Sequence, residues 1–232
     1  MAVCFTRWTV LPHGAVEKLA DNLWRVEAPL GARNRRVMTV ARLRDGRLLV
    51  HNAIALDKPE MKELDAWGEV AAILVPNRFH RQDCRIWKDR YPKAKVYCPA
   101  SASGAVGKAV AVDGSYADAP GDDGVRVRHL QGVGDREGVV EAQSGDGVTL
   151  VFCDTILNLP AMGGVLGFLL HPTGAPSVPR FTRWFFAKDK ATLKADLVAL
   201  ATRRPVRLIP GHGPVVTDGA TAALEAAAGR LS

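Results

Sequence analysis

Three apolar runs that each end in a side chain able to bind a metal constrain this chain most. The run ILVPNRFHRQDC begins as an apolar strand and breaks into a polar loop that carries His80 and Asp83. The runs LVFCD and VRLIPGH end in Asp154 and His212. A loop directly after a buried strand is a common place for side chains that bind a metal or a substrate. We therefore expect one functional site, built where these strands end at one edge of a sheet.

The rest of the chain alternates strands with helices. Alternating and fully apolar runs predict strands over residues 23–28, 37–43, 47–51, 70–75, 95–98, 125–130, 139–143, 148–153 and 206–209. Apolar residues at helical spacing predict helices over residues 59–67, 82–91, 100–110, 181–187, 190–202 and 220–231. Residues 113–124 are rich in Gly, Asp and Pro and predict a surface loop, and residues 158–179 fit neither pattern.

The order of these elements is strands then helices, twice over, without a linker between the halves. Helices outside two mixed sheets in a single domain of residues 1–232 fit this order. A hydrophobic content of 47% with 24% charged residues is typical of a soluble globular protein. No apolar run approaches the roughly 20 residues that span a bilayer, and the N-terminus does not read as a signal peptide. We expect a cytoplasmic protein that lies outside the membrane.

Cysteine usage and charge narrow the possibilities further. The four cysteines contain no CxxC pair, which argues against a zinc knuckle and a disulfide framework. The formal net charge is +7, and it is concentrated in Arg33, Arg35, Arg36, Arg42, Arg44 and Arg47. This arginine cluster has two interpretations: a site that attracts a small anion, or an arginine-rich surface exposed to solvent. We favour the second. Nucleic-acid binding is not expected, because the cluster lacks interleaved aromatic residues.

The strand order and the residues after the strands resemble the metallo-β-lactamase superfamily, a four-layer αββα sandwich. Its main marker is HxHxDH after a strand, followed by further ligands later in the chain. Asp154 in LVFCDTI resembles the bridging Asp of the family, and His212 in LIPGHG resembles its last His. A divergent branch with a domain of unknown function is more similar still. Its motifs correspond to LLVHNAIAL, VPNRFHRQ, YPKAKVYCP, CDTILN and the terminal HG, which together cover most of residues 48–213.

The marker departs from the family pattern in this chain. With His80 at the second His, Arg78 replaces the first His, Gln82 the Asp and Asp83 the last His. A shift of one residue instead places Asn77, Phe79, Arg81 and Gln82 at the marker positions. The middle His of the family corresponds to Val133.

The resemblance implies a metal-dependent hydrolase of a small ester, lactone or phosphoester. His80, Asp154 and His212 would bind one divalent ion such as zinc, iron or manganese. Asp83 and Asp154 would be the catalytic carboxylates, with Asp83 also able to complete the metal site. A metal activates water for such a reaction by lowering its pKa.

The alternative is a metal-free, non-catalytic or anion-binding member of the fold, so whether the protein is an enzyme stays open. In that case Arg78 and Arg81 would form ion pairs with Asp83 or Asp154, or bind a small anionic molecule. His51 ends a strand where the superfamily usually has an acidic residue, and it is a further candidate for the substrate site. Trp184 lies in an apolar helical pattern and is expected in the core.

Overall fold

The computed structural model describes residues 4–30 and 34–231. In this part of the chain the first sheet has seven strands in the order β1-β2-β3-β4-β5-β6-β7. They are β1 (Glu17–Ala20), β2 (Leu23–Leu30), β3 (Asn34–Arg42), β4 (Leu48–His51), β5 (Val70–Leu74), β6 (Lys95–Cys98) and β7 (Gly114–Ser115). The first four strands pair antiparallel, and β4 to β7 run parallel. The sheet is therefore mixed, as the sequence predicts.

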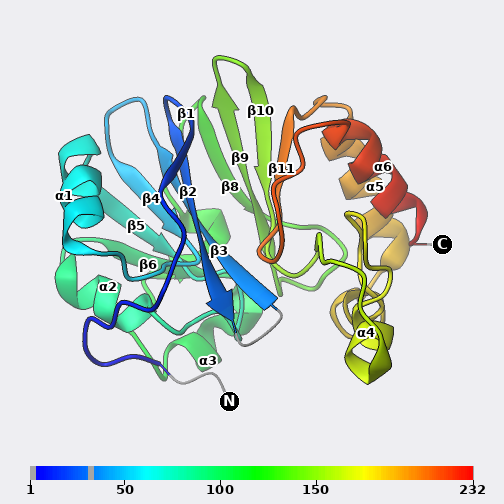
Figure 1. The fold of residues 1–232 in the computed structure, drawn as a ribbon, viewed down its shortest axis with the longest axis horizontal. Helices are drawn as coiled ribbons and strands as arrows, with labels where there is room; N and C mark the ends of the chain where they lie inside the picture. Colours follow the sequence, from blue (N-terminus) through cyan, green and yellow to red (C-terminus); the bar gives the residue numbers. More distant parts are fainter. Residues whose placement is uncertain (1–3, 31–33, 232) are drawn as a thin grey trace.

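The second sheet has four strands among the described residues, in the order β11-β10-β9-β8. They are β8 (Val125–His129), β9 (Gly138–Ser144), β10 (Gly147–Val151) and β11 (Arg207–Ile209). The first three pair antiparallel, whereas β11 runs parallel to β10. Because β10 and β11 are parallel, their following loops leave the sheet at the same edge, which is the lower edge in Figure 1.

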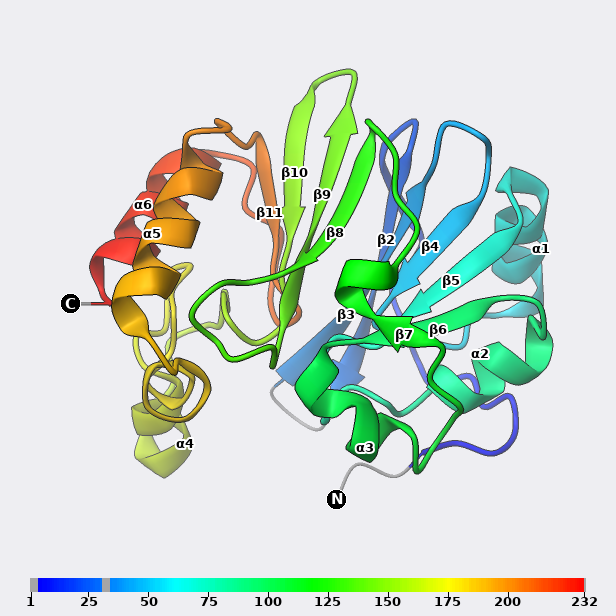
Figure 2. The same ribbon diagram turned by 180° about the vertical axis from the view of Figure 1, so that it is seen from behind.

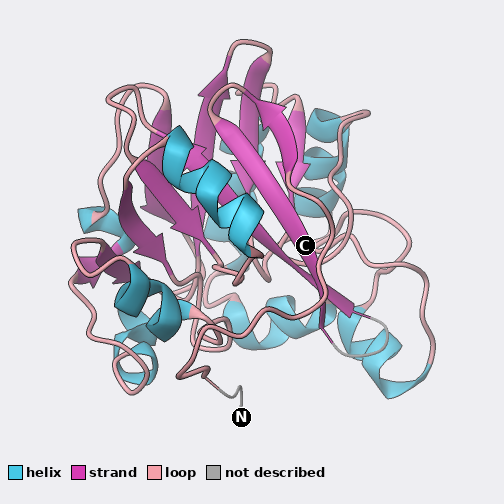
Figure 3. Cartoon of the chain, turned by 60° about the vertical axis from the view of Figure 1, so that its left-hand side comes forward, coloured by secondary structure: helices cyan, strands magenta, loops and turns pink. Residues whose placement is uncertain are grey.

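The helices cover the outer faces of the two sheets (Figures 1 and 2). The first sheet is covered by α1 (Lys58–Trp67), α2 (Cys84–Arg90) and α3 (Ser103–Val106), and the second by α5 (Lys190–Ala201) and α6 (Ala220–Gly229). Figure 3 shows the strands enclosed between helices and loops. This is the four-layer αββα sandwich, and the predicted fold class is confirmed.

Three apolar cores separate these layers. Side chains of β5 alternate between two of them, since Ile73 packs under the helices and Ala72 and Leu74 pack between the sheets. This burial on both faces explains why β5 is apolar throughout. Leu150 and Leu208 of the second sheet pack against α5 and α6 in the third core.

The predicted elements differ from the structure in several places. The strand β1 has no counterpart in the prediction, and the predicted loop over residues 113–124 contains the short strand β7. The predicted helix over residues 100–110 is reduced to a 3-10 turn (Ala100–Ala102) and α3. The unassigned segment contains α4 (Gly164–Leu170), and the helix expected at 181–187 is a π-helical turn, η3 (Thr182–Phe186). No helix within the described residues is long and apolar enough to cross a lipid bilayer.

Candidate metal centre

The side chains of His80, Asp154 and His212 converge at the edge where β5, β10 and β11 end. The two Nε2 atoms lie 3.2 Å apart. Asp154 Oδ1 is 3.3 Å from His80 Nε2 and 3.2 Å from His212 Nε2. His80 follows a strand of the first sheet, whereas the other two follow strands of the second. The structure thus brings the three predicted ligands together, but at an edge shared by both sheets rather than at the edge of one.

The second ring nitrogen of each histidine is held by a hydrogen bond that sets its tautomer. His212 Nδ1 lies 2.6 Å from the carbonyl oxygen of Arg35, which can only accept, so Nδ1 carries the proton. His80 Nδ1 lies 3.1 Å from Asn52 Oδ1. The Asn52 amide nitrogen donates to the Val37 carbonyl at 2.8 Å, so its oxygen faces the ring. In the neutral form of each ring Nε2 thus carries the lone pair, and the two Nε2 atoms face the same point, as in histidines that bind metals.

Asp154 is fixed by a second set of contacts. Asn77 Nδ2 donates to Asp154 Oδ2 at 2.7 Å, which leaves Oδ1 for the two histidines. The turn that carries Asp154 is bound by the buried carboxyl group of Glu137, whose oxygens accept hydrogen bonds from the backbone N–H groups of Cys153, Asp154 and Thr155 at 2.9–3.0 Å. Burial and the charge of Asp154 raise the pKa of Glu137 to about 8. The carboxylate of Asp154, which would bind a metal, is thus held in one orientation.

The electrostatics of the cluster also follow from this arrangement. Burial alone would raise the pKa of Asp154, but the two histidines hold it well below its ordinary value. Burial alone would lower the pKa of His212, but its hydrogen bond to Asp154 and the charge of that carboxylate raise it. Asp154 is therefore an anion at neutral pH.

The donor set fits a divalent metal ion. Bonds of about 2.0–2.1 Å in a tetrahedral zinc site place neighbouring ligand atoms about 3.3 Å apart. The three distances in the cluster are 3.2–3.3 Å. Two imidazole lone pairs and a carboxylate oxygen at this separation repel one another unless a proton or a cation lies between them. Cys153 Sγ also lies near His80 and Asp154, but burial raises the pKa of its thiol well above the ordinary value.

Asp83 does not join this cluster. Its buried carboxylate accepts from Arg36 Nη1 at 2.5 Å and from the Ala55 backbone N–H at 3.2 Å. The groups of possible metal ligands found over residues 4–30 and 34–231 do not include it. The expectation that Asp83 pairs with Arg78 or Arg81 is therefore wrong, because Arg36 from β3 occupies its carboxylate.

The predicted substrate-binding residues are placed in three different environments. Arg78 is exposed and lines a cavity next to the cluster. Arg81 donates to the backbone carbonyl of Ala105. His51 is 2% exposed, and neither of its ring nitrogens has a hydrogen-bond partner among the described residues. Burial, together with the nearby His80, lowers the pKa of His51 to about 3, so its ring is neutral. The structure thus brings only Arg78 of these residues to the cavity.

The arginine cluster is largely paired with carboxylates. Besides the pair with Asp83, the structure contains the ion pairs Arg35–Glu27, Arg44–Asp123 and Arg47–Asp45. Arg42 lies over the ring of Trp67, and Arg33 lies outside the described residues. The interpretation of a wholly solvated surface is wrong for Arg36, which is 4% exposed.

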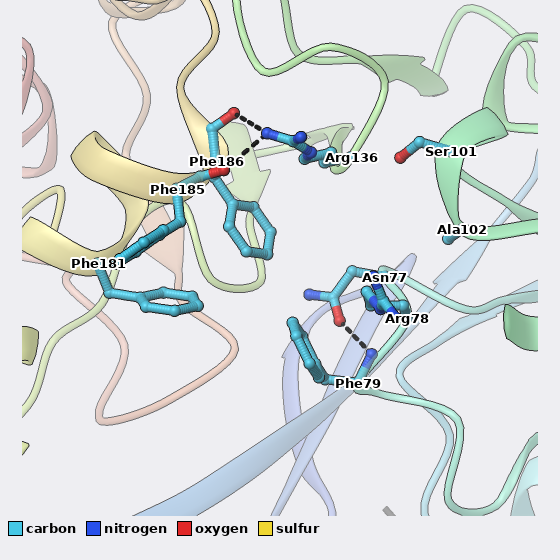
Figure 4. A pocket seen from close by; sticks show the side chains of 9 residues that line it. All are labelled: Asn77, Arg78, Phe79, Ser101, Ala102, Arg136, Phe181, Phe185 and Phe186. Atoms are coloured by element: carbon cyan, nitrogen blue, oxygen red, sulfur yellow. Dashed lines mark hydrogen bonds between the residues drawn. The ribbon is translucent and has the colours of Figure 1, made fainter. Parts of the chain in front are cut away.

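A cavity of about 400 Å³ opens beside the cluster. Asn77, which binds Asp154, is also part of its wall (Figure 4). The lining residues are Asn77, Arg78, Phe79, Ser101, Ala102, Arg136, Phe181, Phe185 and Phe186. Trp184, in the same π-helical turn as two of these phenylalanines, is 51% exposed, so its expected place in the core is wrong.

Sequence reasoning missed Asn52, Asn77, Glu137 and Arg136 as residues of this region. The sequence places Asn77 only at a degraded marker position and does not indicate its contact with Asp154. The other three carry no local signal, since their roles depend on backbone groups far away in the sequence. The positive φ of Asn52 (56°) belongs to the turn after β4, where Asn is well tolerated, and does not reveal that its oxygen meets His80.

Comparisons with known proteins agree with the fold. No protein-family model and no curated protein matches the sequence. DIM-1 metallo-β-lactamase exposed to ceftazidime is 12% identical with a TM-score of 0.65, over 97% of this chain and 100% of that one. TMB-1 is 13% identical with a TM-score of 0.63, over 95% and 99% of the two chains. A metallo-β-lactamase from Pontibacter korlensis is 13% identical with a TM-score of 0.58, over 93% and 98%.

This chain therefore has the metallo-β-lactamase fold over nearly its whole length. The fold that the motif resemblance implies is thus confirmed.

Proposed function

We propose that the protein is a metal-dependent hydrolase that binds one divalent ion through His80 Nε2, Asp154 Oδ1 and His212 Nε2. The observation that carries this proposal is the convergence of three lone-pair atoms at 3.2–3.3 Å, with both histidine tautomers set by their outer hydrogen bonds. Three protein ligands leave a coordination position open, which is typical of catalytic rather than structural zinc sites.

The residues of the chain have separate tasks in this proposal. His80 and His212 supply neutral nitrogen ligands, and Asp154 supplies the negative charge that a divalent cation needs. Asn77 and Glu137 orient Asp154 from two sides. When bound, the ion would act as a Lewis acid and lower the pKa of water at the site.

The reaction class follows from the fold and from the cavity beside the ligands. The neighbours in fold include metallo-β-lactamases, and we extend a hydrolytic activity to this chain. The substrate would be a small ester, lactone or phosphoester. For an ester, the oxygen of water bonds to the acyl carbon, the bond to the alcohol breaks, and the alcohol leaves with one proton of that water.

Metal content tests the proposal directly. The untagged protein, purified without chelator, should contain about one equivalent of zinc, iron or manganese by inductively coupled plasma mass spectrometry. The double variant Asp154→Ala/His212→Ala should lose it. The control Asp89→Ala removes an exposed carboxylate of α2 that pairs with Arg85, and it should retain the metal. A wild-type protein with less than about a tenth of an equivalent, and no uptake on dialysis against these ions, would contradict the proposal.

Turnover is the second part of the test. Wild type should hydrolyse at least one of 4-nitrophenyl acetate, dihydrocoumarin and bis(4-nitrophenyl) phosphate, and the double variant should lose at least about 100-fold in kcat/KM. If the protein contains stoichiometric metal but hydrolyses none of these substrates, the proposed metal site stands and the proposed hydrolase activity is refuted.

The second candidate function is a metal-free member that binds an anion. The observation in its favour is that the same three atoms are also satisfied by a shared proton, because Asp154 raises the pKa of His212. A protonated His212 beside an ionised Asp154 needs no metal. The metal measurement separates the two functions, since this candidate predicts an empty site in both wild type and variant.

A further inference from the structure

The cavity beside the candidate metal centre has a wall of four aromatic rings (Figure 4). The ring centroids of Phe181 lie 5.4 Å from Phe185 and 5.5 Å from Phe186, and Phe186 lies 6.4 Å from Phe79. Phe79 is 50% exposed and Phe185 is 58% exposed. Exposed rings gathered around a cavity of this size are typical of a site for an apolar group.

Two arginines line the same cavity. Arg136 Nη1 donates to the backbone carbonyls of Phe185 at 2.6 Å and Phe186 at 3.2 Å, which fixes the turn that carries the rings (Figure 4). Arg78 is exposed and lies over the ring of Phe79 at 5.7 Å. Within residues 4–30 and 34–231, neither arginine forms an ion pair with a carboxylate, in contrast to Arg36, Arg128 and Arg207. The cavity therefore combines an aromatic wall with positive charge that the protein does not neutralise.

The cavity is joined to the candidate metal centre through Asn77. Its side chain lines the cavity, accepts the Phe79 N–H at 2.8 Å and donates to Asp154 at 2.7 Å. A ligand in the cavity would thus lie one side chain away from Asp154. This places a binding site for part of a molecule next to the place where we propose that its bond is cleaved.

We propose that this cavity binds an amphiphilic organic anion, with an aryl or short acyl group between the phenylalanines and a carboxylate or phosphate at Arg78 and Arg136. The inference names the substrate class of the proposed hydrolase and rests on it for the position of the scissile bond. Binding itself uses no metal ligand. Guanidinium groups suit carboxylates and phosphates because they donate two parallel hydrogen bonds, and they bind more strongly where apolar walls exclude water.

Isothermal titration calorimetry with three probes tests both halves of the site. The probe 4-phenylbutyrate carries the ring and the charge, 4-phenylbutan-1-ol carries only the ring, and acetate only the charge. The full-length protein should bind 4-phenylbutyrate with a dissociation constant on the order of 1 mM or below. The other two probes should bind at least about tenfold more weakly, and 4-phenylbutyl phosphate should bind as well as the carboxylate if both anions share the site.

Variants then locate the binding. Arg78→Gln and Phe185→Ser change exposed side chains, and each should weaken 4-phenylbutyrate at least about tenfold without changing the thermal midpoint. Arg85→Gln, which removes the same charge from the exposed face of α2 outside the cavity, should bind like wild type. Equal binding by wild type and Arg78→Gln, or no saturable binding up to about 10 mM, would overturn the inference.

One further variant separates this inference from the proposed function. His212→Ala removes a proposed metal ligand but no residue of the cavity wall. Binding of 4-phenylbutyrate should stay within about threefold of wild type even where metal and turnover are lost. Loss of binding in His212→Ala would mean that the anion sits at the histidine cluster, which refutes the cavity site but leaves the metal proposal intact.

Discussion

The buried ion pair between Asp83 and Arg36 ties the start of α2 to β3. The Asp83 side chain is fully buried, and that of Arg36 is 5% exposed. Burial raises the pKa of Asp83 even though Arg36 and the Ala55 N–H act in the opposite direction. Each partner therefore depends on the other to offset the cost of its buried charge.

Removal of Asp83 should therefore affect folding and leave metal binding unchanged. Asp83→Ala leaves the Arg36 guanidinium buried and unpaired, so the free energy of unfolding should fall by about 3–5 kcal/mol in urea denaturation. The folded fraction should hold as much metal per molecule as wild type. Asp89→Ala, which breaks an exposed pair on the same helix, should cost about 0.5 kcal/mol or less. If folded Asp83→Ala loses its metal, Asp83 takes part in metal binding and this assignment is wrong.

At the scale of the element, the turn after β11 is shaped by a glycine next to a proposed ligand. Gly213 has a φ of +97°, and a Cβ built on it would lie 1.8 Å from the carbonyl oxygen of Asn158. The Asn158 backbone in turn donates to the His212 carbonyl at 3.1 Å. The close approach of these two segments holds His212 at the end of the strand, and only glycine fits there.

Gly213→Ala should therefore damage both stability and the site. The backbone strain and the clash should together lower the free energy of unfolding by about 3 kcal/mol or more, and metal content should fall with it. Gly219→Ala is the matched control, because Gly219 also has a positive φ (+65°) but has no atom within 4 Å of the added Cβ. It should cost about 1 kcal/mol through strain alone and keep the metal. Equal effects of Gly213→Ala and Gly219→Ala would show that the backbone moves to relieve the clash with Asn158, which would contradict this prediction.

At the scale of the whole molecule, Asp122 connects the two halves. One carboxylate oxygen accepts the Arg44 backbone N–H at 2.6 Å, in the turn between β3 and β4 of the first sheet. The other accepts the N–H groups of Gly124 and Val125 at 2.7 and 2.8 Å, where β8 of the second sheet begins. Partial burial opposes ionisation, but these backbone donors hold the pKa of Asp122 below its ordinary value.

The contribution of Asp122 should depend on pH with a definite sign. A carboxyl group whose pKa is lower in the folded state stabilises the fold above its unfolded pKa of 3.8 and loses this effect as the pH falls through the folded value. Asp122→Asn should lower the free energy of unfolding at pH 7 by about 1 kcal/mol, since the carboxylate is largely in water. The difference from wild type should be constant above about pH 5 and shrink below pH 3.8 in urea denaturation. A difference that grows in acid would contradict this assignment.

The sequence by itself determined the layers and the three side chains that converge at the proposed metal site. Apolar periodicity is a local property, so most strands and long helices were predictable, as were His80, Asp154 and His212 at the strand ends. The burial of β5 on both faces follows from the same local patterns. The elements that the sequence did not predict have only weak hydrophobic periodicity. They are β1, the two-residue strand β7 and the short helix α4.

Only the tertiary structure decided which side chains face one another. Asp83 and His80 are three residues apart, yet one carboxylate is taken by Arg36 from β3 while the ring meets His212 and Asp154 from the other sheet. The outer hydrogen bonds of the site and the pairing of the arginines likewise join residues distant in sequence. The physical reason is that the local sequence determines where each strand ends. Which side chains meet across the two sheets depends instead on how the sheets pack against each other.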